Sequence, residues 1–463
     1  MRIYTILTLL SLFGVASCGG SSPDVSTMPQ VQAPEVGQTD TPINIDDISC
    51  EVNYPLTIST VYVENDRANL PALFDGNKTN ESVWIAPNLD TNIIIELAEP
   101  ALLKALIVTW QSLDFSHLFK VYTSKDKENW QLLDSVEQSK NNALIPDLID
   151  LTATESQATT ALFFKLELAG NEVSQVSEIV ELELFGCEQE TSHSIELIDW
   201  YLSVPTDEDN NGKSDSIKED NLSNGYFDPR FFTLSHDGGL RFSTSVSGYR
   251  TSTNTKYVRT ELREMLRRGD SRYKTQGVNP NNWVFSTAPQ ADQDNAGGID
   301  GTLDVELAIN NVTTTGEDYQ IGRVIIGQIH ANDDEPVRLY YRKLPENTYG
   351  AIYLAHEILG GEDIYYEIIG SRSNSASNPA NGIPLDEKFS YSITVQGHEL
   401  AVTVNKIDGS EFTQVVDMSQ SGYDQGDQYM YFKAGVYNQN NSGDPHDYVQ
   451  ATFYQINNSH SGY

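Results

Sequence analysis

The sequence has little positive charge and few cysteines, and it lacks several motifs that would define a reaction class. Its 463 residues include 29 lysines and arginines against 66 aspartates and glutamates, so the formal net charge is −37. A polyphosphate would be repelled by such a chain, which argues against nucleic acid as its partner. No metal-ligand cluster, nucleophile elbow or phosphate-binding loop stands out in the sequence.

The arginines are concentrated in one part of this acidic chain. Apart from Arg2 and Arg67, every arginine lies between Arg230 and Arg372, and eight of them lie between Arg230 and Arg272. The distribution predicts a basic groove in an acidic body, where the local field attracts anions despite the net charge. An anionic sugar polymer is therefore compatible with the composition.

The first 49 residues predict export rather than a folded domain. Residues 1–17 contain a short apolar run, typical of a secretory signal and too short to span a bilayer. The sequence VASC followed by glycine resembles a bacterial lipobox, which implies cleavage before Cys18 and a lipid on its thiol; the alternative is an ordinary signal peptide. Residues 18–49 are too polar to order themselves and predict a disordered tether. We expect a lipoprotein of the bacterial outer membrane or cell surface, otherwise a secreted protein.

The remaining length predicts two all-β domains. Residues 50–187 contain short apolar or alternating runs separated by turns, which indicate a β-sandwich. In an oxidising compartment Cys50 and Cys187 are expected to pair and to close this domain at its ends. A polar linker at residues 188–194 precedes the second domain, residues 195–463.

Four segments of the second domain alternate between polar and apolar residues at the period of a strand. We expect these strands to be neighbours with one continuous polar face over an apolar core. In the segment RTELRE, the central glutamate can orient one guanidinium while the other binds a carboxylate. In 324–330, Ile325, Gly327 and Ile329 are expected to face the core. The polar faces comprise Arg259, Glu261 and Arg263; Gln328 and His330; Arg338, Tyr340 and Arg342; Tyr431, Lys433 and Tyr437.

The motifs RTELRE at 259–264, QIH at 328–330 and YFKAGVYNQ at 431–439 resemble, in this order, the three signature strands of the alginate lyases of polysaccharide lyase family 7. The resemblance extends from about Ile195 to the C-terminus. It implies a concanavalin-like β-jelly roll that binds alginate and cleaves it by β-elimination to unsaturated uronate oligosaccharides. The resemblance also implies that an isoleucine at position 329 is associated with acceptance of guluronate as a substrate.

The same resemblance assigns catalytic positions to Arg259, Gln328, His330 and Tyr437, with no metal in the chemistry. Arg259 and Gln328 would neutralise the uronate carboxylate. His330 would be the base for guluronate, and Tyr437 the acid for both uronates and the base for mannuronate, accepting a proton if nearby cations lower its pKa. The residues expected to bind substrate are Glu261, Arg263, Arg338, Tyr340, Arg342, Tyr431, Lys433 and Gln439.

The first domain resembles a discoidin-like carbohydrate-binding module of family 32. The resemblance rests on LFDGN at 73–77, on Trp84 and on the ending ELELFGC at 181–187. Such modules often hold a structural calcium, although a plain polar turn is the alternative reading here. The residues with oxygens suited to calcium are Asp75, Asn77, Asn80 and Glu181.

Two other functions compete with lyase activity. A non-catalytic alginate-binding surface lipoprotein would keep the basic groove without the acid and base. A glycoside hydrolase would need two facing carboxylates, and Glu261 has no evident partner. His236, His356 and His446 are isolated in the sequence and are interpreted as structural or surface residues. We expect a monomer.

Overall fold

The computed structural model describes residues 54–63, 70–79, 81–88, 91–111, 117–136, 147–150, 161–171, 176–187, 194–235 and 237–462. Several sequence-based predictions therefore lie outside the described residues. They are the signal peptide, Cys18, the tether, Cys50, Asn80, most of the linker and His236. Within the described part, no helix has the length and apolarity that a membrane span requires.

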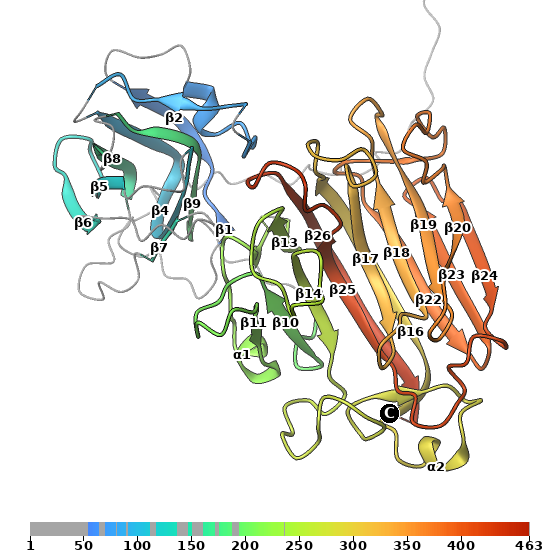
Figure 1. Cartoon of the computed structure of the whole chain (residues 1–463). Coiled ribbons are helices and arrows are strands. Elements are labelled where there is room, and N and C mark those ends of the chain that lie inside the picture. The colour runs from blue at the N-terminus through green and yellow to red at the C-terminus, as the bar shows by residue number, and fades with distance from the viewer. Residues whose placement is uncertain are drawn as a thin grey trace, which may run out of the picture. The chain divides into compact units, whose positions relative to one another are not determined.

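The strands between Tyr54 and Cys187 form one nine-stranded sheet system around an apolar core (Figure 1). The strands are β1 (Tyr54–Pro55), β2 (Ile58–Val63), β3 (Trp84–Ile85), β4 (Asn92–Trp110), β5 (His117–Ser124), β6 (Gln131–Val136), β7 (Asp147–Asp150), β8 (Ala161–Asn171) and β9 (Glu178–Cys187), with a short 3-10 helix η2 (Leu70–Leu73). The first half of the long strand β4 pairs with β2 and β8, and its second half pairs with β7 and β9.

The rest of the described chain forms two further sheets and two short helices. The strands are β10 (Trp200–Val204), β11 (Asp215–Ile217), β12 (Phe232–Leu234), β13 (Leu240–Ser245), β14 (Arg259–Glu264), β15 (Trp283–Val284), β16 (Gly298–Asn311), β17 (Arg323–His330), β18 (Val337–Arg342), β19 (Tyr349–Glu357), β20 (Asp363–Ile369), β21 (Ile383–Pro384), β22 (Phe389–Gln396), β23 (Glu399–Lys406), β24 (Glu411–Asp417), β25 (Tyr431–Asn438) and β26 (Tyr448–Ser461). The helices are α1 (Glu219–Ser223) and α2 (Gln290–Gln293).

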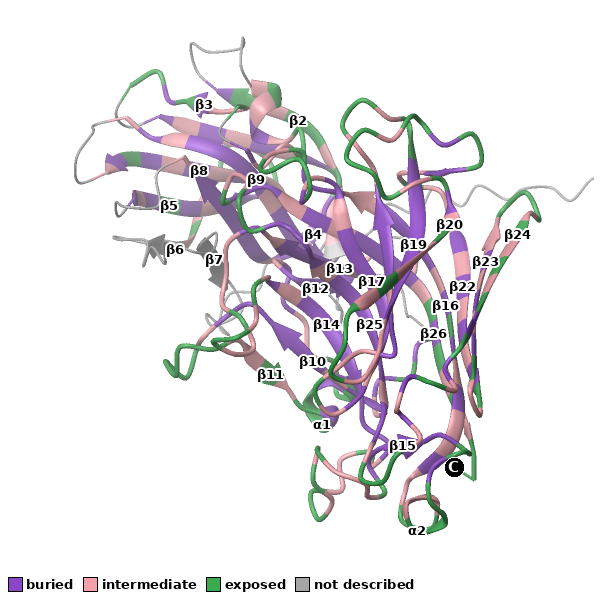
Figure 2. Ribbon diagram, turned by 45° about the vertical axis from the view of Figure 1, so that its right-hand side comes forward, coloured by how far each residue is buried: buried purple, intermediate pink, exposed green. Residues whose placement is uncertain are grey.

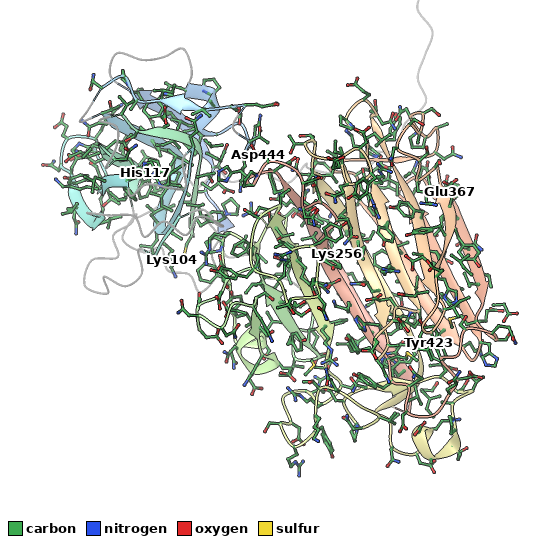
Figure 3. The ribbon with its side chains drawn as sticks, viewed as in Figure 1. Lys104, His117, Lys256, Glu367, Tyr423 and Asp444 are labelled. Carbon is green, nitrogen blue, oxygen red and sulfur yellow. The ribbon has the colours of Figure 1, made fainter. Side chains whose placement is uncertain are left out.

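These two sheets make the jelly roll that the motifs predict. One sheet has the order β11-β10-β14-β25-β17-β18-β19-β20, and the other has the order β12-β13-β26-β16-β22-β23-β24. Apolar residues of both sheets, such as Leu262 and Phe432 from one and Phe242 from the other, share a single core, seen as the purple faces in Figure 2. Tyr423, labelled in Figure 3, is also part of this core. The four segments with polar faces are consecutive neighbours in the first sheet, which confirms the predicted adjacency.

A bulge in β17 breaks the strict alternation that the sequence suggests. Ile325 pairs with Tyr340 while Gly327 pairs with Leu339, so Ile326 is the extra residue. Ile325 therefore lies beside Tyr340 and not in the main core, and its predicted orientation was wrong. The carbonyl of Ile326 accepts a hydrogen bond from the Tyr391 hydroxyl at 2.7 Å. A Cβ on Gly327 would lie 2.4 Å from that hydroxyl, so glycine is required where the bulge meets the core.

The last glutamate of RTELRE, Glu264, is structural. It is fully buried, and Oε2 accepts hydrogen bonds from Trp283 Nε1 and Phe432 N, both at 3.0 Å. Oε1 accepts from Asn458 Nδ2 at 2.7 Å and from His460 Nε2 at 2.8 Å. Burial opposes a charge on His460, but the contact with Glu264 outweighs it and raises the pKa of the imidazole. One buried carboxylate thus ties β14 to β25 and β26 across the two sheets.

Candidate active site

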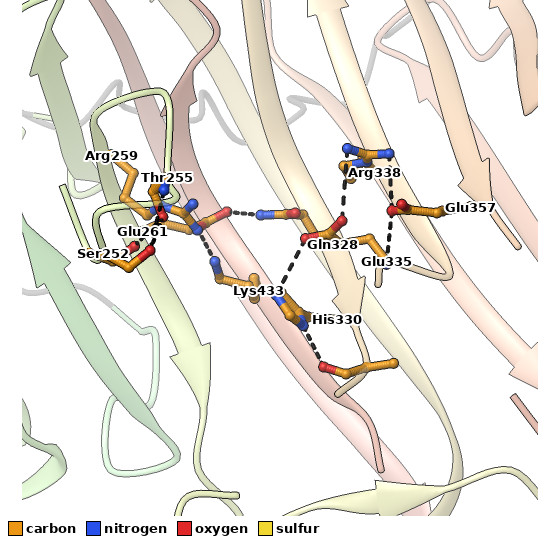
Figure 4. A network of polar contacts seen from close by, with 12 residues as sticks. Ser252, Thr255, Arg259, Glu261, Gln328, His330, Glu335, Arg338, Glu357 and Lys433 are labelled. Carbon is orange, nitrogen blue, oxygen red and sulfur yellow. Dashed lines mark hydrogen bonds and ion pairs between the residues drawn. The ribbon is translucent and has the colours of Figure 1, made fainter. Parts of the chain in front are cut away.

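Glu261 is the centre of a cluster of polar side chains from β14, β17 and β25 (Figure 4). Its Oε2 accepts a hydrogen bond from Arg259 Nη1 at 2.8 Å and forms an ion pair with Lys433 Nζ. Its Oε1 accepts from Gln328 Nε2. Although burial opposes ionisation, Lys433 and Arg259 hold the pKa of Glu261 below its ordinary value. The carboxylate therefore orients three donors at once. One of them is a guanidinium, as expected from the sequence.

The cluster carries one excess positive charge. Arg259 and Lys433 are cations, and Glu261 is the anion that both contact. Arg259 Nε is buried and has no hydrogen-bond partner among the described residues. Because a buried unpaired donor is costly, a ligand carboxylate at this position would gain both a hydrogen bond and charge compensation.

Tyr437 lies opposite Arg259 on the neighbouring strand. The centre of the Arg259 guanidinium is 3.6 Å from the centre of the phenol ring. Burial raises the pKa of Tyr437 above its ordinary value and outweighs the opposing effect of Arg259. The condition under which Tyr437 was expected to accept a proton, a net lowering of its pKa by nearby cations, is therefore not met. The phenol keeps its proton in neutral solution and is suited to donate it.

His330 is held as a neutral imidazole with a defined tautomer. Its Nδ1 is 2.5 Å from Ala331 O, and because a carbonyl oxygen only accepts, Nδ1 carries the proton. The ring stacks on Tyr431 with 5.0 Å between centroids and 11° between planes. Burial, with Lys433 acting in the same direction, lowers the pKa of His330 to about 3. Nε2 is thus the nitrogen with the free lone pair, 3.3 Å from Glu335 Oε1.

Arg263 supports the site but is not a free cation. Its guanidinium centre lies 3.9 Å from the centre of the Tyr431 ring. Its Nη2 donates to Thr275 O and to Asn282 Oδ1, the latter at 3.3 Å, and its Nη1 lies 3.3 Å from Met265 Sδ. These contacts favour an orienting role for Arg263 over the direct substrate binding expected from the sequence.

Arg338 also differs from its predicted role as a cation for substrate. It forms ion pairs with Glu357 at 3.3 Å, with Glu335 at 3.8 Å and with Asp363. Three carboxylates surround one guanidinium, so Arg338 contributes no excess positive charge to the polar face. Glu335 and Glu357 were missed in the sequence because side chains at loops and strand ends cannot be placed by alternation.

Arg342 and Gln439 are turned towards the main chain. Arg342 donates to Asp318 O at 2.6 Å, Arg372 O at 2.5 Å and Ile321 O at 3.3 Å. These contacts hold two loops together, and they replace the predicted role of Arg342 in substrate binding. Gln439 is 6% exposed, and its Nε2 donates to the carbonyl of the preceding residue at 3.5 Å.

An aromatic pair extends the polar face beyond the charged cluster. Tyr340 and Tyr353 stack with 4.7 Å between centroids and 7° between planes, next to Ile325 and Ala355. Tyr340 was predicted from β18. Tyr353 was missed, although its strand alternates in the same way, with Tyr353 and Ala355 two residues apart.

The first domain offers one observation relevant to a cation. Within the described ranges, Glu181 Oε2 is buried without a hydrogen-bond partner, and burial, together with Glu183, raises the pKa of Glu181 to about 9. Asp75 instead accepts hydrogen bonds from Asn77 N at 2.8 Å and Ser82 Oγ at 2.5 Å. Among the described residues, no group of three or more His, Cys, Asp or Glu side chains could hold a metal ion. Cys187 is disulfide-bonded.

A jelly roll with an excess positive charge, a neutral imidazole and a protonated phenol on one sheet face defines an acid–base enzyme for an anionic carbohydrate. The family model described as alginate lyase matches residues 195–460, and the chain belongs to this family. It is a polysaccharide lyase.

The chain is similar to the following known sequence and solved structures. An alginate lyase of Klebsiella pneumoniae is 54% identical over 274 residues, which are 57% of this chain and 89% of that protein. The crystal structure of the alginate lyase from Klebsiella pneumoniae has a TM-score of 0.57 at 52% identity, covering 58% of this chain and 97% of that chain. The match to the structure of a truncated AlyQ with CBM32 and alginate lyase domains covers 89% of this chain and 99% of that chain, at 17% identity and a TM-score of 0.34.

The charge of Lys433 predicts an alkaline limit for activity. Burial, with Arg259 acting in the same direction, lowers the pKa of Lys433 to about 8. Above that pH the cluster loses its excess positive charge, so binding of an anionic substrate weakens. We expect kcat/KM to fall by up to about tenfold per pH unit above pH 8, mainly through KM.

Initial rates across the alkaline range for wild type and Lys433→Arg test this expectation. A guanidinium stays charged, so the fall in kcat/KM should begin at a higher pH in Lys433→Arg. The matched control is Lys406→Arg on β23, in the other sheet, which should leave the pH of this fall unchanged. If an active Lys433→Arg enzyme loses kcat/KM at the same pH as wild type, the fall is due to another group.

Proposed function

We propose that this protein cleaves alginate by β-elimination and releases unsaturated uronate oligosaccharides. The observation that carries the proposal is the cluster around Glu261, with one excess positive charge between a neutral His330 and a protonated Tyr437. A uronate carries a carboxylate next to the carbon that must lose a proton. The cluster supplies a positive charge for the carboxylate, and the neighbouring His330 and Tyr437 supply groups that can take up and donate protons.

The first step is neutralisation of the uronate carboxylate. Arg259 and Gln328 each have donor capacity beyond their contacts with Glu261, and Arg259 Nε has no hydrogen-bond partner in the part of the chain that the structure describes. When the C5 proton leaves, negative charge builds up on the carboxylate. Hydrogen bonds to developing charge are typically worth about 3 kcal/mol each. Arg259 and Gln328 would therefore bind the transition state more tightly than the substrate.

The second step moves two protons. His330 Nε2 accepts the C5 proton, the electron pair forms the C4–C5 double bond, and the C4–O4 bond breaks. Tyr437 gives its proton to O4. After each turnover, the imidazolium loses its proton to solvent and the phenolate regains one. Guluronate fits this scheme because His330 is neutral, whereas cleavage of mannuronate through Tyr437 as base requires ionisation of a phenol with a raised pKa.

The rest of the chain is proposed to deliver this domain to its substrate. We infer a signal peptide at 1–17, a tether at 18–49 with a lipid on Cys18, a carbohydrate-binding module at 50–187, a linker at 188–194 and the lyase domain at 195–463. The separate core of the described part of the first module supports this division. A calcium ion in that module would give the unpartnered Glu181 Oε2 a ligand role. The protein is proposed to act as a monomer at the bacterial surface.

Ultraviolet absorbance on polyguluronate, polymannuronate and native alginate tests the function. A lyase raises the absorbance because each cleavage creates a double bond conjugated with the carboxylate, and we expect the steepest rise on polyguluronate. Release of reducing ends without absorbance would indicate a hydrolase, and neither signal would indicate a binding protein. Either outcome would overturn the proposal.

A further inference from the structure

Glu335 lies five residues after His330, in the loop between β17 and β18. Its Oε1 is 3.3 Å from His330 Nε2, and its Oε2 is 3.8 Å from Arg338 Nη1. The main chain is anchored as well, since Glu335 N donates to Glu357 Oε2 at 3.3 Å and Glu335 O accepts from Glu357 N at 3.2 Å. Tyr423 in turn donates its hydroxyl to Glu357 O at 2.7 Å. The carboxylate is therefore held next to the lone-pair nitrogen of His330.

The contact between Glu335 and His330 is mismatched while the imidazole is neutral. Nδ1 carries the ring proton because it faces Ala331 O at 2.5 Å. Nε2 then presents a lone pair to a carboxylate oxygen, and neither atom has a proton to donate. A proton arriving on Nε2 converts the contact into a charge-assisted hydrogen bond. The interaction is thus stronger after proton transfer than before it, which is the condition for lowering a barrier.

Glu335 is the carboxylate in direct contact with the imidazole. Lys433 and Arg259 oppose a positive imidazole, whereas Glu261 favours it but is already engaged by both of these cations and by Gln328. Glu357 and Asp363 form ion pairs with Arg338 and not with His330. Burial, with a hydrogen bond to Glu335, raises the pKa of Glu357 to about 7, so this carboxyl is partly protonated near neutral pH. Glu335 and Asp363 still outnumber the one guanidinium, so negative charge remains uncompensated beside the imidazole.

We propose that Glu335 is a positioning residue that directs His330 Nε2 and stabilises the imidazolium formed when the C5 proton is taken up. The proposal rests on the proposed function of His330 as the base. In this step the C5–H bond breaks, the proton goes to Nε2, and its electron pair forms the double bond as C4–O4 breaks and O4 takes the Tyr437 proton. Glu335 Oε1 accepts the new N–H until the proton returns to solvent.

The test compares Glu335→Gln, Glu335→Asp and Asp363→Asn in the full chain, on polyguluronate and polymannuronate. Glu335→Gln removes the charge and offers an amide N–H that occupies the Nε2 lone pair. We expect kcat on polyguluronate to fall by about 10- to 100-fold, the size typical of a residue acting through another, with KM nearly unchanged. Glu335→Asp should recover part of this loss. Asp363→Asn also removes an Arg338 partner but touches neither Glu335 nor His330, and should stay within about twofold of wild type.

The ratio of polyguluronate to polymannuronate rates is the decisive readout, because within one preparation it does not depend on the folded fraction. A ratio that falls in Glu335→Gln but not in Asp363→Asn supports the proposal. A wild-type ratio in Glu335→Gln overturns it, while selective loss in His330→Asn would show that the proposed base still stands. Equal losses in Glu335→Gln and Asp363→Asn also overturn it, since they would indicate a structural role through Arg338.

Discussion

Replacing Tyr437 with phenylalanine should lower kcat/KM by about 100- to 10,000-fold on both polyguluronate and polymannuronate, the range typical for loss of a general acid. The ring stays under the Arg259 guanidinium, 3.6 Å from its centre, so the packing of the site is kept. Only the proton that O4 needs is removed. The loss should therefore appear in kcat, with little change in KM.

The measurement is the initial rate of absorbance increase over a range of substrate concentrations. Tyr257→Phe is the matched control, because Tyr257 packs against Tyr437 edge to face at 6.3 Å and has no role in the proposed proton transfers. It should retain activity within about threefold. Near-normal rates for Tyr437→Phe would remove the proposed mechanism altogether.

Replacing His330 with asparagine should harm guluronate cleavage more than mannuronate cleavage. We expect a loss of at least about 100-fold in kcat/KM on polyguluronate, because the base is gone. Part of the loss will be common to both substrates, since the stacking of His330 on Tyr431 is removed as well. The difference between the two substrates isolates the contribution of the base.

The ratio of kcat/KM values on the two block types converts directly into a difference in barrier. His398→Asn serves as the control, because His398 pairs with Asp424 and its side chain is 35% exposed, far in the sequence from the motif strands. Its ratio should equal that of wild type. Equal losses for His330→Asn on both substrates would make this histidine a shared base or a neutraliser of the carboxylate.

Much of the polar face could be predicted because a strand has a side-chain period of two. Arg259 and Glu261 must share a face, as must Gln328 and His330, whatever the rest of the chain does. The family motifs then indicated that their strands are neighbours, and the register confirms it, with Gln328 opposite Lys433. The alternation could not anticipate the bulge in β17, which depends on the fit of Gly327 against Tyr391.

The sequence by itself determined which residue types alternate along each strand and hence where the charged face lies, and the resemblance of its motifs to a known family implied the jelly roll. Only the tertiary structure decided what each charge does. Arg342 binds loop carbonyls and Glu335 meets His330, because loops bring distant residues together in ways that no local period records. Burial decided the protonation states, since it outweighs Arg259 at Tyr437 and favours neutral His330. Burial depends on how the whole chain packs, so no local pattern in the sequence predicts it.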